Sequence, residues 1–358
     1  MLETLYNESG RGDHMLSNDD LLLPNGYINM PAIIEKGNTF TFIFGARGTG
    51  KTWGALEYCY RNRIKFIYMR RTQTQLNLIS IDDTNPFKSI DDAITVKPVR
   101  KEVTGVYLSD EEGKPAGAPI GYMLALSTVS NVRGFDMSDI DILIFDEFEG
   151  EAHERRIKAE DSAFFNAYET INRNRELSGK APLKALLMAN SNDMAVPVIL
   201  AFKLVHDLEN MARKGQSVLN LDARDITLIL MSLTPISQKK ARTALYRAVG
   251  SGSFADMAIN NRFSANDLTN VTTRSFKEYK PLVNVGELFI YQHKDKRDYY
   301  ISPHNHGSFT ANYDADTVSL KKWRKDYYIL WLAHLNKRVY FEGYTEKVLF
   351  EKYFNIGL

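Results

Sequence analysis

The sequence contains little cysteine and no marked excess of either charge. Its single cysteine, Cys59, excludes an internal disulfide and a zinc site built on cysteines. The seven histidines are scattered, and the close pair His304 and His306 has no further ligands nearby, so we expect a polar turn there. With 45 Lys and Arg against 44 Asp and Glu, the net charge is +1. A contact with nucleic acid would therefore depend on local clusters of basic side chains.

Long apolar runs are missing too. No stretch approaches the roughly 18 apolar residues of a membrane span, and the N-terminus lacks the pattern of a signal peptide. These absences predict an intracellular protein without a membrane partner. The hydrophobic fraction of 44% and the charged fraction of 25% are ordinary for a globular protein, and 358 residues suffice for two domains.

An apolar run that breaks on glycines carries the clearest motif of the chain. The stretch FTFIFGARGTGKTWGALEYCYRNR reads as a strand, a glycine-rich loop and a helix. It matches G-x-x-x-x-G-K-[ST], in which loop N–H groups and the helix N-terminus surround nucleotide phosphates. Lys51 would reach the β- and γ-phosphates and Thr52 would bind Mg²⁺; the alternative is a glycine-rich turn with an incidental lysine. The predicted nucleotide-binding residues are Gly45, Ala46, Arg47, Gly48, Thr49, Gly50, Lys51 and Thr52.

Two consecutive carboxylates end a second apolar run, DIDILIFDEFEG. An Asp at such a strand end holds Mg²⁺ and its water shell in nucleotide hydrolases, so Asp146 is predicted to bind the metal. Glu147 would deprotonate the attacking water as a general base. The alternative is that both are solvated residues at the start of a loop. A glutamate here favours an ATPase of the additional-strand class over a small GTPase or a metabolite kinase.

Strand-like runs recur along the first two thirds of the chain. Several are apolar nearly throughout, which is typical of strands buried on both faces of a parallel sheet, and helical segments lie between some of them. The pattern predicts an α/β fold, a P-loop NTPase of the additional-strand class with a mainly parallel sheet and nucleotide chemistry at the carboxyl ends of its strands. The runs are 39–44, 65–70, 121–127, 139–145, 184–190 and 225–231.

Changes in composition along the sequence also predict domain boundaries. Residues 1–15 are expected to be a leader outside the fold, disordered or left by cloning, and 16–233 to form the P-loop ATPase domain. A basic helix-like stretch, a Gly-Ser turn and a short helix predict a linker or lid subdomain at 234–270. Aromatic and β-branched residues return in 271–358, where ELFIYQHKDKRDYYIS predicts a hairpin and 316–341 has helical periodicity. We expect a second, smaller α+β domain there.

Arginines and an asparagine extend the candidate site. Arg133, in STVSNVRGFDMSDID, resembles a basic residue near the nucleotide in the large terminase subunits, the motors that pump DNA into virus capsids. Arg173 and Arg175 end a predicted helix, and an arginine presented to a neighbouring subunit's γ-phosphate stabilises charge in the transition state. Asn190, at the tip of the next strand, is placed to sense that phosphate. The alternative for these arginines is that they cover helix-end carbonyls or pair with Glu176.

Several motifs that follow one another along the chain indicate a more specific family. FGARGTGKT, FIYMRRTQTQL, IFDEF, RNRE followed by LMANS, and FADMAINNRF occur in this order along the chain. Their order and spacing resemble the genome-packaging ATPases of phi29-like bacteriophages over most of residues 39–265. The resemblance implies that Asp146 completes a metal site with Thr52 and that Glu147 activates water. It implies that Arg173 acts on a neighbouring subunit and that Arg133 is a second basic group near that interface.

The resemblance also implies partners. The family works as a homomeric ring, a pentamer, docked on the portal vertex of a procapsid in the host cytoplasm, where ATP hydrolysis moves double-stranded DNA inward. A scaffold RNA is a further candidate partner. Because packaging must ignore sequence, DNA contacts would go to the phosphate backbone. Candidates for them, which solvated surface positions explain equally well, are Lys239, Lys240, Arg242, Lys294, Lys296 and Arg297.

The C-terminal domain resembles a degenerate form of the RNase H-like nuclease of larger terminases. Its first candidate strand, ELFIYQHK, lacks the interior Asp that a two-metal nuclease needs, so we expect no DNA cleavage. Three alternatives stay open. A terminase with an active nuclease would need convergent carboxylates in residues 271–358, a helicase-like ATPase would load on single strands through stacking aromatics, and a nucleotide-regulated switch would need neither Arg173 nor Glu147.

Overall fold

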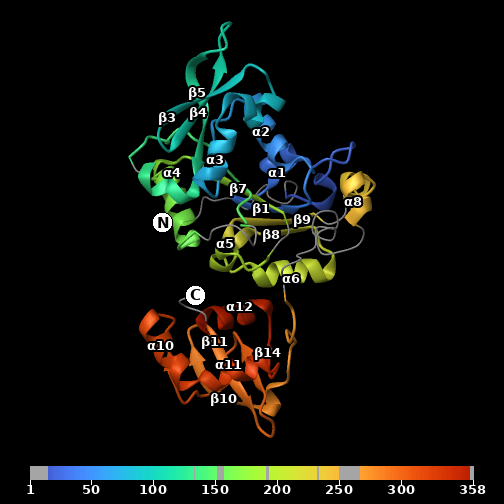
Figure 1. The fold of residues 1–358 in the computed structure, drawn as a ribbon, viewed down its shortest axis with the longest axis vertical. Helices are drawn as coiled ribbons and strands as arrows, with labels where there is room; N and C mark the ends of the chain where they lie inside the picture. The colour runs from blue at the N-terminus through green and yellow to red at the C-terminus, as the bar shows by residue number, and fades with distance from the viewer. Residues whose placement is uncertain are drawn as a thin grey trace, which may run out of the picture. The chain divides into compact units, whose positions relative to one another are not determined.

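The larger of two sheets has nine strands in the computed structural model, which describes residues 15–132, 134–150, 157–190, 193–231, 234–249 and 267–354. Their order is β3-β4-β5-β2-β6-β7-β1-β9-β8 (Figure 1). Six neighbours, from β5 through β9 in that order, are mutually parallel. The strands are β1 Phe40–Gly45, β2 Phe66–Arg70, β3 Ile94–Arg100, β4 Val103–Ser109, β5 Pro115–Ala125, β6 Ile142–Asp146, β7 Lys184–Ala189, β8 Val218–Leu221 and β9 Ile226–Met231.

The parallel strands lie where the sequence predicts them. β1, β2, β5, β6, β7 and β9 overlap the six apolar runs, and every residue of β6 and β9 is buried. This burial follows from their sequences, ILIFD and ITLILM, because a sheet covered on both faces has no solvated side for polar residues. The predicted mixed α/β fold with a large, mainly parallel sheet is confirmed.

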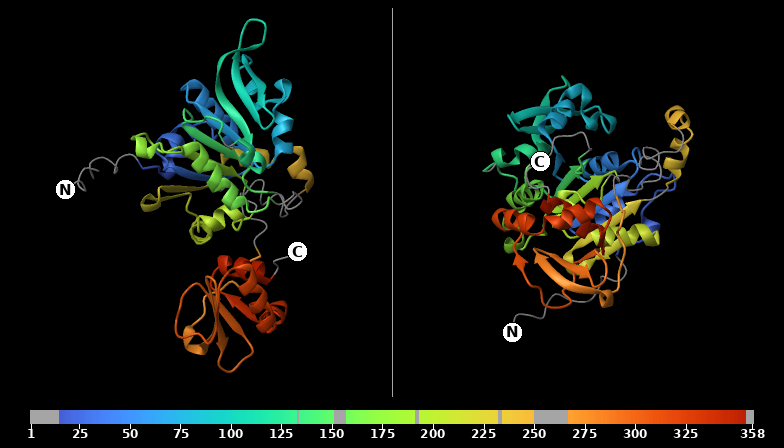
Figure 2. Two further views of the ribbon diagram at one scale, coloured as in Figure 1. Left: turned by 90° about the vertical axis from the view of Figure 1, so that its left-hand side faces the viewer. Right: turned by 60° about the horizontal axis from the view of Figure 1, so that its bottom comes forward.

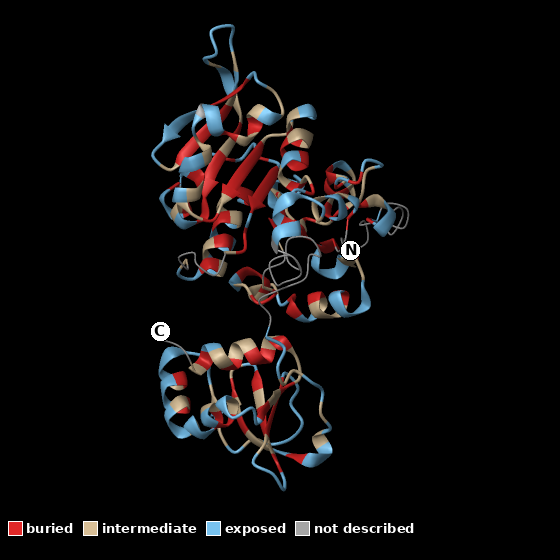
Figure 3. Ribbon diagram, turned by 45° about the vertical axis from the view of Figure 1, so that its right-hand side comes forward, coloured by how far each residue is buried: buried red, intermediate tan, exposed pale blue. Residues whose placement is uncertain are grey.

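Apolar side chains on both faces of this sheet are buried (Figure 3). On one face, Ile43 of β1 lies in a buried cluster with Cys59 of α2 and Leu76 of α3. On the other, Phe145 of β6 stacks on Phe164 of α4 with ring centroids 5.8 Å apart. The helices of this part of the chain are α1 Met30–Lys36, α2 Lys51–Arg61, α3 Gln73–Ile79, α4 Glu160–Asn172, α5 Pro197–Ala201, α6 Val205–Lys214, α7 Pro235–Lys240 and α8 Ala244–Val249.

An antiparallel extension at one edge of the sheet was not predicted. β3 pairs with β4, and β4 pairs in turn with β5, which begins six residues before the predicted run. The last four residues of β3 are exposed and include Lys97, Pro98 and Arg100, so this strand lacks the apolar signal of a buried one. The connection from β4 to β5 projects from the sheet (Figure 2).

The chain divides into two compact units, Met1–Ala201 with Leu208–Ser264, and Phe202–Asp207 with Ala265–Leu358. The second unit contains a five-stranded sheet in the order β13-β10-β11-β12-β14. Helices α10, α11 and α12 pack on it through Trp323, Leu330 and Phe350. The elements are β10 Tyr279–Val285, β11 Leu288–His293, β12 Tyr299–Ser302, β13 Asn312–Tyr313, α10 Thr317–Asp326, α11 Tyr328–Leu335, β14 Val339–Phe341 and α12 Tyr344–Phe354.

The hairpin expected in the second unit is confirmed, because β11 and β12 are antiparallel neighbours. The helical prediction over 316–341 is only partly right, since α11 ends at Leu335 and the last residues form β14. Lys337 has a φ of +58°, a left-handed conformation that stops the helix and turns the chain back toward β12. Among the described residues, no helix has the length and apolar character to cross a membrane.

Candidate nucleotide-binding site

The glycine-rich loop joins the carboxyl end of β1 to the first turn of α2. Gly48 and Gly50 have φ angles of +78° and +90°, left-handed values that glycine adopts without a steric cost. Gly50 is the N-cap residue of α2, so the N-terminus of the helix and its first N–H groups face the loop. The Thr49 hydroxyl donates to the carbonyl of Ala46 over 3.0 Å and closes the turn. The backbone is thus shaped to surround an anion.

Lys51 folds back over this loop. Its Nζ donates to the carbonyl oxygens of Gly45 at 2.6 Å and Ala46 at 3.1 Å, and its side chain is buried. Burial lowers the pKa of Lys51 to about 8, although the nearby carboxylates of Asp146 and Glu147 oppose that shift. A phosphate would offer this ammonium group a charged acceptor in place of two neutral carbonyls.

Asp146 accepts three hydrogen bonds from side chains of two elements, α2 and β2. Its Oδ2 accepts hydrogen bonds from the Thr52 hydroxyl at 3.0 Å, the Tyr68 hydroxyl at 2.7 Å and Arg70 Nη1 at 3.2 Å. The carboxylate is 5% exposed, and burial together with its charge raises the pKa of Tyr68 well above the usual value. The structure therefore brings together the two predicted metal ligands, Thr52 and Asp146.

Glu147 has a strained backbone and a charged partner. Its φ is +51°, an uncommon value for a residue with a side chain, and such outliers often mark functional positions. The same Arg70 that donates to Asp146 forms an ion pair with the Glu147 carboxylate, which is about half exposed. The two predicted carboxylates therefore share one guanidinium, and the sequence analysis did not predict a role for Arg70.

Asn190 lies at the same edge of the sheet. It follows Ala189, the last residue of β7, which pairs with Phe44 of β1. On the other side of β7, Met188 pairs with Asp146. The strand therefore carries Asn190 to a position between the glycine-rich loop and the carboxylates.

Arg173 and Arg175 lie elsewhere. Arg173 donates to the Phe135 carbonyl at 3.0 Å and to Asp136 at 3.3 Å, and 41% of its side chain is exposed. The Phe135 ring contacts Tyr122, near the start of the parallel part of β5. Arg173 is thus near the edge where the parallel strands begin, whereas the phosphate loop is at the edge where they end.

Arg175 makes a different set of contacts. Its guanidinium donates to the carbonyl of Ile140, to Asp141 at 2.8 Å and to the carbonyl of Ala181 at 3.0 Å. Only 10% of its side chain is exposed. Arg175 therefore ties the chain before β6 to the chain before β7, which supports the structural alternative for this arginine. Arg133 lies outside the described residues.

Two segments that the sequence analysis did not connect with the loop lie against it. Lys240 of α7 donates from Nζ to the carbonyl of Arg47 over 2.9 Å. The backbone N–H of Ile28 donates to the carbonyl of Thr49 over 3.1 Å, and a Cβ on Gly50 would lie 3.2 Å from the ring of Tyr27. The sequence around Lys240 does not indicate a contact with a loop so far away along the chain. Lys240 was instead predicted to be a candidate for contacting DNA.

A buried ion pair lies next to the site, directly after Arg70 in the chain. Arg71, next to Arg70, makes two hydrogen bonds to the Glu160 carboxylate, at 2.6 and 3.0 Å, and both side chains are at most 5% exposed. A Cβ on Gly150 would lie 2.5 Å from the Arg71 guanidinium, so this glycine leaves room for it. The pair joins the end of β2 to the start of α4.

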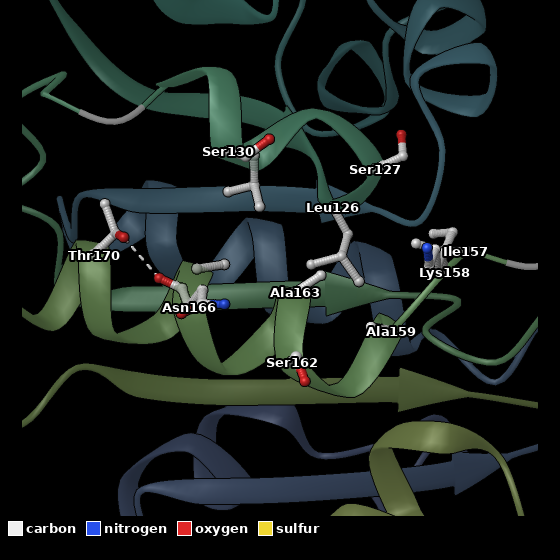
Figure 4. A pocket seen from close by; sticks show the side chains of 12 residues that line it. Leu126, Ser127, Ser130, Ile157, Lys158, Ala159, Ser162, Ala163, Asn166 and Thr170 are labelled. Atoms are coloured by element: carbon white, nitrogen blue, oxygen red, sulfur yellow. Dashed lines mark hydrogen bonds between the residues drawn. The ribbon is translucent and has the colours of Figure 1, made fainter. Parts of the chain in front are cut away.

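A cavity of about 310 Å³ lies between α4 and the 3-10 helix η4, Leu126–Val132 (Figure 4). Leu126 points across it toward Ala163, and Ser127, Ser162 and Asn166 contribute polar groups to its lining. The predicted site residues do not line this cavity.

The aspartates that a C-terminal nuclease would need do not form a metal cluster in the described residues, where no three His, Cys, Asp or Glu side chains are grouped to hold an ion. Asp316 caps α10 by accepting from the N–H groups of Val318 and Ser319. Asp295 lies in the β11–β12 turn, where its N–H donates to His293.

Comparison with known proteins places the chain in a family. Residues 24–305 match the Podovirus DNA encapsidation protein (Gp16) family. The chain belongs to this family. Membership confirms the expected relation to phage packaging proteins and the expected viral DNA-packaging function.

Similarity to individual proteins and solved structures supports the assignment of this chain to the Gp16 family. It is 25% identical over 260 residues to the DNA packaging proteins of Bacillus phages phi29 and PZA, covering 70% of this chain and 69% of each relative. The phi29 genome packaging motor assembly matches with a TM-score of 0.62 at 18% identity, over 92% of this chain and 98% of that one. The Phi-28 gp11 packaging motor matches with a TM-score of 0.58 at 15% identity, over 96% and 99%. At these identities the structures show the shared fold alone.

We expect Glu160→Gln to destabilise the larger unit by about 3 kcal/mol, because it removes the carboxylate charge from the buried ion pair with Arg71. Urea unfolding would measure the loss. Glu57→Gln is the matched control, since it removes the exposed pair with Arg61 and should change the free energy of unfolding by less than about 0.5 kcal/mol. Equal small effects of both changes would contradict a supporting role for the buried pair.

Proposed function

We propose that this chain is an ATP-hydrolysing motor subunit that moves double-stranded DNA into a viral procapsid. The observation that carries the proposal is the contact between Thr52 and Asp146 at 3.0 Å beside the buried ammonium group of Lys51. These are the residue types that a phosphate loop and a metal-binding strand end bring together in nucleotide hydrolases. Membership in a DNA encapsidation family supports DNA as the cargo.

The residues of the loop fit a nucleotide with Mg²⁺. The N–H groups from Gly45 to Thr52 and the Lys51 ammonium group would bind the phosphates, and Thr52 and Asp146 supply the hard oxygen ligands that Mg²⁺ prefers. A bound metal would neutralise charge on the phosphates. Two protein ligands are ordinary for Mg²⁺, which is usually bound through one or two protein groups together with waters and substrate phosphates.

The order of the strands supports the additional-strand class. β7 lies between β1, which carries the phosphate loop, and β6, which carries Asp146. Asn190 at the end of this intervening strand is then next to both, where its amide would contact the γ-phosphate and report whether it has been cleaved.

Glu147 would act as the general base for the attacking water. In the structure the Glu147 carboxylate contacts Arg70. Proton transfer therefore requires the carboxylate to leave this guanidinium and turn toward the attacking water. Its half-exposed side chain is free enough to make that movement.

Arg173 would act on the nucleotide of a neighbouring subunit. Its contacts are near the edge of the sheet opposite the phosphate loop of its own chain, so an arginine finger at this position requires a ring. We propose a homomeric ring, a pentamer docked on the portal, in which Arg133 is a second basic group at the interface and a scaffold RNA is a candidate partner. Residues 234–270 would form the linker between the ATPase domain and a C-terminal domain that is a degenerate relative of RNase H-like nucleases.

We expect Glu147→Gln to bind ATP with normal affinity and to hydrolyse it at least about 100-fold more slowly, because the general base is lost. Binding would be measured by calorimetry and hydrolysis by phosphate release. Lys51→Ala should lose binding itself, and Glu111→Gln, an exposed change in the β4–β5 connection, should alter neither quantity. Normal turnover by Glu147→Gln would contradict the assignment of the base.

We expect Arg173→Ala and Glu147→Gln to be inactive separately and active as a mixture, since a ring then contains intact phosphate sites facing intact arginines. Phosphate release after mixing would be compared with that of the double variant mixed with Glu147→Gln, which offers no intact site. A mixture no more active than its components would argue against action between subunits.

A further inference from the structure

Lys240 provides a second ammonium group at the phosphate loop. Its Nζ donates to the Arg47 carbonyl over 2.9 Å and would lie 3.5 Å from a Cβ on Gly48. The side chain is partly buried, and the ammonium group also lies 5.6 Å from the centre of the Tyr246 ring of α8. Neither the carbonyl nor the ring carries a charge, so these two contacts hold the positive charge of Lys240 near the loop without neutralising it.

The two ammonium groups lie at the same loop. Lys51 Nζ donates to the carbonyls of Gly45 and Ala46, and Lys240 Nζ donates to the carbonyl of the next residue, Arg47. Bringing two like charges into a partly buried site costs free energy unless an anion lies between or beside them. Since Lys51 of a phosphate loop reaches the β- and γ-phosphates, the anion that would satisfy both is the terminal part of a nucleoside triphosphate.

We propose that Lys240 binds the γ-phosphate of ATP and thereby couples the position of α7 to the presence of that phosphate. The inference rests on the proposed function, because it needs ATP at the loop. It assigns Lys240 to the nucleotide instead of to DNA.

The placement of α7 suits such a coupling. The helix starts next to the loop, because Met231 at the end of β9 pairs with Gly45 at the end of β1. The Thr234 hydroxyl accepts from the N–H of Ser237, and this buried cap fixes the first turn. Lys240 is the last residue of α7, one helix turn beyond that cap. A shift of its side chain from the Arg47 carbonyl to a phosphate would therefore act on the end of α7 that leads into α8.

The neighbouring Lys239 provides a matched control. It is on the same short helix and carries the same charge, but its side chain is exposed. A general effect of positive charge near the site would be similar for both lysines, whereas a direct contact with phosphate would be specific to Lys240.

The test is to measure the dissociation constants of ATP and ADP, each with Mg²⁺, for the full chain carrying Glu147→Gln so that ATP is not consumed. In this background Lys240→Gln should weaken ATP binding about tenfold or more, as for a lost charge-assisted hydrogen bond, and should change ADP binding by less than about twofold. Lys240→Arg should restore most of the ATP affinity, and Lys239→Gln should leave both constants unchanged.

The ratio of the two constants separates a phosphate contact from a structural role. A variant that merely disturbs the loop weakens ATP and ADP together, so an unchanged ratio in Lys240→Gln would overturn the inference, as would an equal effect of Lys239→Gln. If the background protein binds ATP in a Lys51-dependent way while the ratio is unchanged, only the role of Lys240 fails. If it does not bind ATP, the proposed function fails as well.

Discussion

The carboxylate of Asp146 is the acceptor on which the rest of the site depends. A hydroxyl from α2, a phenol from β2 and a guanidinium from the end of β2 all donate to its Oδ2. Taking a carboxylate out of water is costly unless donors replace the lost hydration. These donors stabilise the charge and at the same time fix Thr52 and Arg70 relative to the glycine-rich loop, so a single buried charge sets the geometry of the proposed metal ligands and of the proposed general base beside them.

Arg70 links the two carboxylates of the site, Asp146 and Glu147. Because one guanidinium contacts both Asp146 and Glu147, the residue that would bind the metal and the residue that would activate water are electrostatically linked. In the proposed function Thr52 and Asp146 would hold the metal and Glu147 would accept a proton, so the contacts of Arg70 with both carboxylates would have to rearrange before hydrolysis. The proposed role of Arg173, which lies near the opposite edge of the sheet, adds a further requirement, namely a neighbouring subunit.

The sequence predicts well those features that depend on local pattern. The glycines of the loop, the apolar runs of β6 and β9 and the carboxylates at the end of β6 all lie where the motifs and periodicity indicate, since each is determined by a few adjacent residues. β3 was missed because its exposed half has the composition of a loop, and β14 because a left-handed Lys337 interrupts an otherwise helical pattern. The contacts of Lys240 with Arg47 and of Arg71 with Glu160 join residues far apart in the chain, and only the packed fold reveals them. The sequence alone did not decide whether Arg175 is catalytic or structural. Its contacts with the chain before β6 and before β7 favour a structural role.

The most direct test of the central claim is steady-state ATP hydrolysis by the full chain with double-stranded DNA, with single-stranded DNA and without DNA, using Lys51→Ala as the control for background activity. A motor that moves duplex DNA by contacts with its phosphate backbone predicts clear stimulation by the duplex regardless of its sequence, little stimulation by single strands and no activity in Lys51→Ala. Equal hydrolysis under all three conditions, or a preference for single strands, would contradict the coupling of this site to the movement of double-stranded DNA.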